Sequence, residues 1–458
     1  MTLIKSISGI RGTIGGQPGD NLTPIDIVKF TAAFATLIQD NNQGKRLKFV
    51  VGRDARISGP MVESLIISTL SGMGIDVINT GLSTTPTVEM AVVNLKANGG
   101  IIITASHNPK QWNALKLLDG SGEFISAADG EKVLKYAETE NINFCDVDEL
   151  GKVVNDDTTI NTHIQQILDL DLVDKDLITK SGFKVAIDAV NSTGGISIPP
   201  LLKALGVNDI IELYCEPTGN FPHNPEPIPQ NLGEICKLVT NTKADIGVVV
   251  DPDVDRLALV MENGELFGEE YTLVAVADYI LQSKKGNSVS NLSSTRALRD
   301  VTEKAGGNYT ASAVGEVNVV HKMKETNAII GGEGNGGVIY PELHYGRDAL
   351  VGIALILTYL AKENITLSEL RSRYNDYFVS KNRIDLTADM NVADMYSLVK
   401  SHYSKYPILT IDGVKIDFPD GWVHLRTSNT EPIMRVYAES TSMEKADKYA
   451  KEIIDLIT

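Results

Sequence analysis

One pattern occurs three times in this chain, and it constrains the fold more than any other feature. Each copy has an apolar strand, a polar turn, a helical segment, one or two glycines and a second strand. The copies begin at Leu47–Val51, Lys184–Ile187 and Ser288–Leu292. A further apolar run follows each copy and ends in a polar loop. Buried strands alternating with helices are typical of α/β domains with mixed or parallel sheets, so three related α/β domains are predicted.

The rest of the chain follows a different pattern. A helical stretch over 367–377 connects the repeats to a region that, from about residue 381, is predicted to contain a helix, several strands and a final amphipathic helix over 444–457. This mixture indicates a smaller C-terminal α+β domain. The predicted domain boundaries are 1–155, 156–256, 257–370 and 371–458.

Composition limits the partners and the compartment. Acidic residues outnumber basic residues 59 to 42, and the net charge of −17 disfavours nucleic acid and anionic membranes, so an anionic ligand needs local arginines. The three cysteines (Cys145, Cys215 and Cys236) are far apart, as expected in a reducing cytoplasm rather than in a disulfide framework. The N-terminus lacks a signal-peptide pattern, and the apolar run 349–361 is too short to span a bilayer. A soluble cytoplasmic protein is predicted.

The polar loop after the first repeat is Thr104-Ala-Ser-His-Asn-Pro109. Ser106 directly follows a buried strand, where a sheet presents side chains to ligands. The neighbouring His107 can move protons or orient a phosphate. The G-x-S-x-G pattern of many serine hydrolases is absent. Taken alone, the segment also fits an ordinary turn.

The loop after the second repeat is Asp251-Pro-Asp-Val-Asp-Arg256. Carboxylates at alternate positions (Asp251, Asp253 and Asp255) repel one another unless a cation lies among them. A helix–loop–helix calcium site is excluded, because its sixth position needs glycine where this chain has Arg256, and because both flanks resemble strands. A solvated acidic turn rarely follows five buried apolar residues. A metal site is therefore predicted, with Arg256 directed at a phosphate beside it.

Two further loops have the composition of binding sites. In the segment 332–337, Glu333 and Asn335 lie among glycines, which suits sugar hydroxyls but also a flexible turn. The segment 426–435 combines two arginines with hydroxyls and an amide, which suits a phosphate cradle, although a polar hairpin is the alternative. Near the N-terminus, Arg11 lies between two glycines.

These loops, in this order, resemble those of the α-D-phosphohexomutase superfamily along the whole chain. The resemblance implies four domains around a central cleft, a phosphoryl group on Ser106, and Mg²⁺ held by that phosphate together with the three aspartates. It also implies sugar binding by Glu333 and Asn335, and the sugar loop looks like the form found in archaeal-type phosphoglucosamine mutases. By the same resemblance, Lys116 is a candidate for proton transfer, and the phosphate-binding loop comprises Arg426, Ser428, Asn429, Thr430 and Arg435.

The implied reaction interconverts 6-phospho and 1-phospho sugars through a sugar 1,6-bisphosphate, which also acts as an activator. Arg11 would neutralise charge on the transferring group, and either Lys116 or His107 would take the hydroxyl proton. Glucosamine phosphate is the first expected substrate, with glucose or mannose phosphate as the alternative. A metal-dependent phosphoserine hydrolase and a non-catalytic sugar-phosphate sensor are rival interpretations. A monomer or a homodimer is expected.

Overall fold

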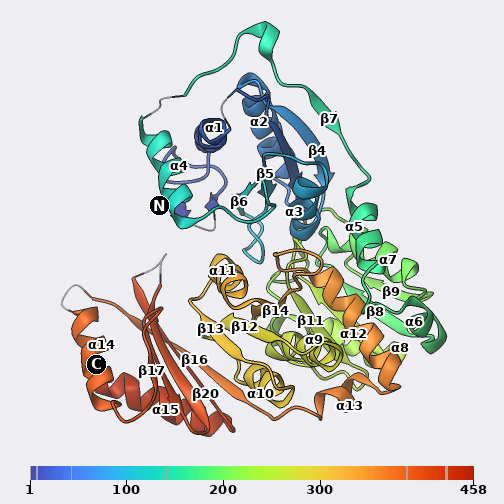
Figure 1. Ribbon diagram of the computed structural model, residues 1–458, viewed down its shortest axis with the longest axis vertical. Coiled ribbons are helices and arrows are strands. Elements are labelled where there is room, and N and C mark those ends of the chain that lie inside the picture. The colour runs from blue at the N-terminus through green and yellow to red at the C-terminus, as the bar shows by residue number, and fades with distance from the viewer. Residues whose placement is uncertain (1, 7–8, 43, 140–141, 388–389, 429–431) are drawn as a thin grey trace. The chain divides into compact units, whose positions relative to one another are not determined.

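The computed structural model describes all residues except 1, 7–8, 43, 140–141, 388–389 and 429–431 (Figure 1). The chain forms two compact units. The first unit is Met1–Thr272 with Gly336–Leu370, and the second unit is Leu273–Asn335 with Arg371–Thr458. Among the described residues, no helix is both long enough and apolar enough to cross a membrane.

The first sheet of the first unit contains the first repeat. Its strand order is β1-β2-β6-β5-β3-β4-β7, and β3 lies between two parallel partners, β4 and β5, while β6 runs antiparallel to β5 and β2. The strands are β1 Ile4–Ser6, β2 Gly9–Thr13, β3 Lys48–Arg53, β4 Asp76–Leu82, β5 Gly99–Ile103, β6 Trp112–Asp119 and β7 Val153–Asn155. The helices of this region are α1 Pro24–Asn41, α2 Gly59–Gly72, α3 Thr85–Asn94 and α4 Ala127–Thr139, followed by the short 3₁₀ helix Val147–Glu149.

The second repeat forms the other sheet of the first unit, in the order β11-β10-β8-β9. Here β8 lies between its parallel partners β9 and β10, and β11 pairs antiparallel with β10. The strands are β8 Lys184–Asp188, β9 Asp209–Leu213, β10 Ile246–Val250 and β11 Leu257–Met261. The helical segments are α5 Thr159–Leu168, α6 Lys175–Ser181, α7 Gly194–Ala204, Pro229–Asn231 (3₁₀) and α8 Gly233–Thr242. The first unit also contains β15 Gly337–Ile339, α12 Ala349–Glu363 and α13 Leu367–Arg371. As predicted, the apolar run in α12 is a buried helix, not a membrane span.

The third repeat lies in the second unit and has the same arrangement. Strand β12 lies between its parallel partners β13 and β14, so in all three copies the first strand of the pattern is central. This shared topology confirms the predicted α/β repeat. The elements are β12 Asn287–Asn291, α10 Ala297–Lys304, β13 Tyr309–Ser312, α11 Glu316–Thr326 and β14 Ala328–Glu333, and the helix before them is α9 Glu269–Ser283.

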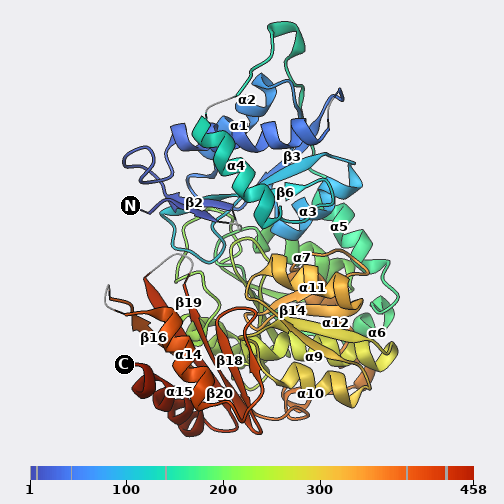
Figure 2. The same ribbon diagram turned by 60° about the vertical axis from the view of Figure 1, so that its left-hand side comes forward.

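The C-terminal region of the second unit is an antiparallel sheet in the order β16-β20-β19-β18-β17, with α14 and α15 against it (Figure 2). Side chains from both helices and from the sheet form one hydrophobic core. The elements are β16 Phe378–Asp385, α14 Val392–His402, β17 Ile408–Leu409, β18 Val414–Phe418, β19 Gly421–Thr427, β20 Ile433–Ser440 and α15 Met443–Ile457. This is the predicted smaller α+β domain.

Two details of the C-terminal prediction are wrong. The helix expected over 367–377 ends at Arg371, and beyond it the hydroxyls of Tyr374 and Tyr377 donate to Asp278 and Asp300 at 3.0 and 2.7 Å. Strand β16 was missed altogether. It is an edge strand that pairs only with β20, and its charged, largely exposed residues hide the alternation that identifies a strand.

Candidate active site

The serine loop, residues 104–109, leaves the end of β5 and returns into β6. Ser106 has a left-handed backbone with φ of +48°, which is uncommon for a residue other than glycine. Its amide donates to Thr104 Oγ1 at 2.9 Å, which holds the turn from inside. Such a conformation costs roughly 1–3 kcal/mol and persists only where the surroundings fix it, as they commonly do at functional sites.

Arg56 fixes this loop from outside. Its guanidinium is fully buried, pairs with Asp54 at 3.0 Å, and donates to the carbonyls of Asn108 and Pro109 at 2.7 and 2.8 Å. Burial raises the pKa of Asp54, and the adjacent Arg56 opposes that shift. Arg56 is therefore a positioning residue for the serine loop. The sequence prediction missed it, although it lies in the polar turn after the first repeat strand.

The aspartate triad (Asp251, Asp253 and Asp255) occupies the corresponding loop between β10 and β11. All three residues are fully buried. Asp251 Oδ1 accepts from the amides of Asp255 and Arg256, each at 3.2 Å, which curls the loop around the first carboxylate. Ser106 Oγ donates to Asp251 Oδ2 at 2.7 Å. The fold thus brings together the two loops that the sequence identified separately.

Lys116 and Arg347 are the cations that face the triad. Lys116 Nζ donates to Asp253 at 2.8 Å and lies 3.3 Å from Asp255, and Arg347 donates to Asp255 at 2.6 Å. Burial alone would raise the pKa of Asp253, but the charge of Lys116 and the hydrogen bonds from Lys116 and Thr85 together hold the pKa below its usual value. Burial would likewise lower the pKa of Lys116, but Asp253 and Asp255 raise it. Lys116 is therefore protonated in this arrangement.

Asp251 differs from its neighbours, because burial and then the charges of Asp255 and Asp253 raise its pKa well above the usual value. Oδ1 of Asp253 and Oδ1 of Asp255 are buried and have no hydrogen-bond partner within the described parts of the chain. One oxygen from each aspartate lies within 4.8 Å of those of the other two. Buried carboxylate oxygens with unused lone pairs are hard ligands, so the triad fits a divalent cation that prefers oxygen.

Three other predicted residues lie around the serine loop. Arg11 donates to Asn108 Oδ1 at 3.2 Å, and His107 Nδ1 is 3.4 Å from Ser106 Oγ. Burial and then the charge of Arg256 lower the pKa of His107 well below its usual value, so this imidazole is neutral. Arg256 lies 3.8 Å from Glu226, on the same side as His107. Thr85, which the sequence prediction missed, donates to Asp253 at 2.6 Å.

In the second unit, the end of β14 holds the predicted sugar loop. Glu333 is 6% exposed, and its Oε1 accepts from the Asn291 side chain at 2.8 Å and from the Gly315 amide at 3.2 Å. Gly334 donates its amide to Ser294 at 3.0 Å. These contacts give the Glu333 carboxylate a defined orientation, whereas a freely flexible turn would leave it mobile. Asn335 follows two residues later and is partly buried.

The predicted phosphate loop joins β19 to β20, and three arginines lie side by side across its base. Arg426 is paired with Arg435 across these strands, and Arg435 is paired with Arg383 of β16. Like charges directly opposite in a sheet are destabilising, and carboxylates balance part of this arginine row: Asp412 lies 3.6 Å from Arg426, and Asp385 lies 3.9 Å from Arg383. Arg383 was missed because β16 was missed. Ser428 lies at the end of β19, whereas Asn429 and Thr430 lie outside the described residues.

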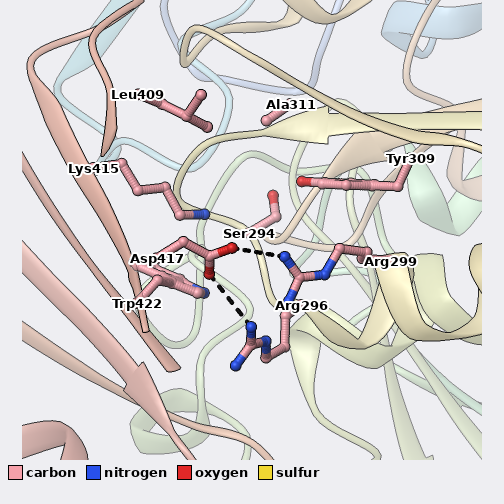
Figure 3. A pocket seen from close by; sticks show the side chains of 9 residues that line it. All are labelled: Ser294, Arg296, Arg299, Tyr309, Ala311, Leu409, Lys415, Asp417 and Trp422. Carbon is pink, nitrogen blue, oxygen red and sulfur yellow. Dashed lines mark hydrogen bonds and ion pairs between the residues drawn. The ribbon is translucent and has the colours of Figure 1, made fainter. Parts of the chain in front are cut away.

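The second unit also contains a small cavity of about 50 Å³ that no sequence feature predicted (Figure 3). One carboxylate serves both arginines: Asp417 contacts Arg296 at 3.3 Å and Arg299 at 2.8 Å. Lys415 donates to the Leu292 carbonyl at 2.7 Å and lies 4.3 Å from the centre of the Trp422 ring. Each of these three cations therefore has a partner within the second unit.

Comparison with known families identifies the family of this chain. Four family models match in order: phosphoglucomutase/phosphomannomutase α/β/α domain I over residues 3–143, domain II over 161–264, domain III over 268–377, and the C-terminal domain over 370–456. The chain therefore belongs to the phosphoglucomutase/phosphomannomutase family. Its activity is that of a phosphohexomutase, an isomerase that moves a phosphoryl group within a sugar phosphate.

Relatives of known name cover almost the whole chain. A phosphoglucomutase/phosphomannomutase from Thermococcus kodakarensis is 35% identical over 97% of this chain and 98% of its own length. A probable phosphoglucosamine mutase from Methanopyrus kandleri is 31% identical over 98% of this chain and 96% of its own. Among solved structures, a family member from Burkholderia thailandensis superposes with a TM-score of 0.84 and 26% identity, covering 99% of this chain and 96% of that one.

Proposed function

We propose that this chain interconverts glucosamine 6-phosphate and glucosamine 1-phosphate, with Ser106 as the phosphoryl carrier. The observation that carries the proposal is the Ser106 hydroxyl, held at a strand end in a left-handed conformation and 2.7 Å from the aspartate triad. Several relatives named as phosphoglucosamine mutases support glucosamine as the sugar. The relative named phosphoglucomutase/phosphomannomutase supports glucose or mannose phosphate as the second candidate.

In the forward direction the phosphorylated Ser106 donates its phosphoryl group to the free hydroxyl of the sugar phosphate. The bond between phosphorus and the serine oxygen breaks, a bond to the sugar oxygen forms, a base takes the hydroxyl proton, and the freed serine oxygen gains a proton. The bisphosphorylated sugar then returns its other phosphate to Ser106, and a proton goes to the oxygen that is freed. Each cycle therefore regenerates phosphoserine, and added sugar 1,6-bisphosphate activates unphosphorylated enzyme by the same step.

The residues around Ser106 have distinct roles in this scheme. Mg²⁺ held by Asp251, Asp253 and Asp255 would neutralise charge on the transferring phosphoryl group. His107 is neutral and close to Ser106, so it can accept a proton. Lys116 is protonated, so it can donate one to the departing oxygen. Arg11 adds positive charge beside the loop.

The second unit supplies the remaining recognition groups. Glu333 and Asn335 are assigned to sugar hydroxyls or the amino group, and the oriented carboxylate of Glu333 suits an ammonium. The arginine row, with Ser428, Asn429 and Thr430, is assigned to the phosphate that is not reacting. Charge-assisted hydrogen bonds from arginine hold a phosphate in either orientation of the sugar.

The first experiment compares glucosamine, glucose and mannose 6-phosphates as substrates, with free phosphate measured in parallel. We expect the highest kcat/KM for the glucosamine substrate and negligible phosphate release. Intact-mass analysis should locate one phosphoryl group on the peptide that contains Ser106. If free phosphate were released at the rate at which substrate is consumed, the protein would be a hydrolase. If kcat/KM were the same for all three sugar phosphates, the assignment of glucosamine phosphate as the substrate would be wrong.

The second experiment tests the arginine row. Losing one charge-assisted contact costs about 1.5–3 kcal/mol, so Arg435→Ala should raise KM roughly ten- to a hundredfold. It should also increase the dependence on added sugar bisphosphate, because the intermediate escapes more readily. Arg46→Ala, which removes an exposed arginine paired with Asp76, is the matched control. If the rate depended on added sugar bisphosphate in the same way for wild type and Arg435→Ala, the arginine row would not be part of the binding site.

A further inference from the structure

A second cluster of metal-ligating side chains lies in the first unit, apart from the aspartate triad. Three segments contribute to this histidine cluster: His163 from α5, His344 from the segment before α12, and Asp348 at the start of α12. The side chains of His163 and Asp348 are fully buried, and that of His344 is 11% exposed. None of the roles assigned to the reaction involves these residues.

Both imidazoles direct the same nitrogen at the same oxygen. Nε2 of His163 is 2.9 Å from Asp348 Oδ2, and Nε2 of His344 is 3.4 Å from that atom. The other carboxylate oxygen, Oδ1, is already used, because it caps α12 by accepting from the amide of Leu350 at 2.8 Å. The cap orients the carboxylate so that Oδ2 faces the two rings.

The far nitrogens of the rings have partners on α3. Nδ1 of His344 is 3.4 Å from Glu89 Oε2, and Nδ1 of His163 is 2.9 Å from Thr87 Oγ1. Nδ1 of His344 thus faces a carboxylate, as its Nε2 does, and although burial opposes the shift, Asp348 and Glu89 raise the pKa of His344 to about 10. Thr87 can accept from Nδ1 of His163 or donate to it. Metal-bound histidines have this arrangement, in which an outer oxygen fixes the tautomer and leaves Nε2 free as a ligand.

Both Nε2 atoms and one carboxylate oxygen therefore converge in a buried space. Protons on the rings balance the negative charge there, and one dication bound by the same three atoms would take their place. The two carboxylates of Asp348 and Glu89 together carry the charge that one dication balances. Ligand atoms about 2.0–2.2 Å from a tetrahedral zinc are roughly 3.3 Å apart. The separations of 2.9 and 3.4 Å bracket that value, and all three atoms lie within 4.8 Å of one another.

We propose that His163, His344 and Asp348 form a second, structural metal site that binds a transition-metal dication of the Zn²⁺ type. Imidazole nitrogen with one carboxylate selects such a metal over Mg²⁺, which prefers oxygen ligands only. Three protein ligands leave a fourth position, which a water fills.

The site would act on the aspartate triad through two short connections. On α3, Thr85 contacts Asp253, and Thr87 follows two residues later at the histidine cluster. At the start of α12, Arg347 contacts Asp255, and its neighbour Asp348 is the proposed ligand. Metal binding would therefore fix the helix starts that support two members of the triad, and its loss would loosen them.

The experiment uses the full-length chain, stripped with chelator and then saturated with Mg²⁺ to occupy the triad. Titration with Zn²⁺ should bind one equivalent and raise the Tm by a few degrees. X-ray absorption at the zinc edge should show imidazole nitrogens at about 2.0–2.1 Å. His344→Gln and Asp348→Asn should each lower zinc affinity at least tenfold; the asparagine variant retains a helix cap and so is expected to fold.

Two controls separate this site from other metal binding. His321→Gln removes an exposed histidine of α11 and should leave the zinc stoichiometry at one. Asp253→Asn alters the triad and should also leave it unchanged, so failure of the proposed mutase mechanism does not affect this test. Equal zinc binding by wild type and Asp348→Asn, or absence of imidazole from the absorption spectrum, would overturn the proposal and leave the cluster as a proton-holding network.

Discussion

The two units bury their ionisable groups in different ways. In the first unit, three aspartates converge, and two of their oxygens have no hydrogen-bond partner among the described residues. In the cavity of the second unit, Asp417 pairs with both the buried Arg296 and the partly exposed Arg299. The contrast shows that burial of charge does not by itself mark a functional site. Converging carboxylates with unused lone pairs can bind a divalent cation, whereas an arginine and a carboxylate in contact stabilise each other.

The second unit contains one intermediate case. Burial raises the pKa of Glu439 and lowers that of Lys415 to about 8, so both groups favour their neutral forms. Glu439 also accepts from the indole of Trp422 at 2.8 Å. Proton uptake and release can therefore relieve charge here, whereas in the triad Lys116 and Arg347 balance part of the negative charge.

The largest effect is expected from Ser106→Ala, which removes the phosphoryl carrier while the fold remains. Turnover should fall by at least about a thousandfold, because no other group can carry the phosphoryl. Steady-state rates with added sugar bisphosphate provide the measurement. Ser290→Ala, which removes a buried serine of the second unit, should change turnover only by a small factor. Comparable losses in both variants would contradict the assignment of chemistry to the first unit.

Lys116→Met should give the next largest effect. Removing the cation from a buried carboxylate cluster costs about 3–5 kcal/mol of unfolding free energy. Since the triad then needs another cation, millimolar Mg²⁺ should restore much of that loss. Denaturant unfolding with and without Mg²⁺ measures this directly. Stability that is independent of Mg²⁺ in this variant would mean that the triad does not bind the metal.

A pH effect is expected from His424, which is buried in β19 of the second unit. Burial lowers its pKa to about 4, although its Nε2 donates to the Asp412 carbonyl at 2.7 Å. The unfolded chain binds this proton near pH 6.5, so stability present above about pH 6.5 is lost as pH falls toward about 4. The loss should approach about 3 kcal/mol.

The test for His424 compares unfolding of wild type and His424→Gln across that pH range. With Trp112→Phe in both proteins, Trp422 is the single remaining tryptophan and reports on the second unit. The difference in unfolding free energy between the two proteins should shrink as pH falls. A difference that does not change with pH would show that His424 has the same pKa in the folded and unfolded chain.

The smallest effect is expected from Lys415→Met. This lysine is already partly neutral near pH 8, and methionine retains most of its contact with Trp422. The loss of one hydrogen bond to Leu292 should cost about 1–2 kcal/mol. In contrast to Lys116→Met, added Mg²⁺ should not change the unfolding free energy of this variant. If Mg²⁺ restored the stability of Lys415→Met, the two units would not differ in their need for a cation.

Much of the fold follows from local patterns. The repeated strand, turn and helix were predictable because apolar runs and glycines act over fewer than ten residues. The aspartate triad was predictable for the same reason, since alternate residues in one short loop lie close together wherever the fold places that loop. Edge strand β16 shows the limit, because its residues are polar and only pairing with β20 makes them a strand.

The sequence by itself therefore determined the three α/β repeats, the C-terminal α+β region, the serine loop after a buried strand and the carboxylates of the triad. Only the tertiary structure placed Arg56 beneath the serine loop, Arg347 on Asp255, and His163 beside His344 and Asp348. These partners are separated by 50 to 185 residues, and no short-range pattern encodes them. Packing of α3, α5 and α12 against one another brings the histidine cluster together, so its chemistry exists only in the folded chain.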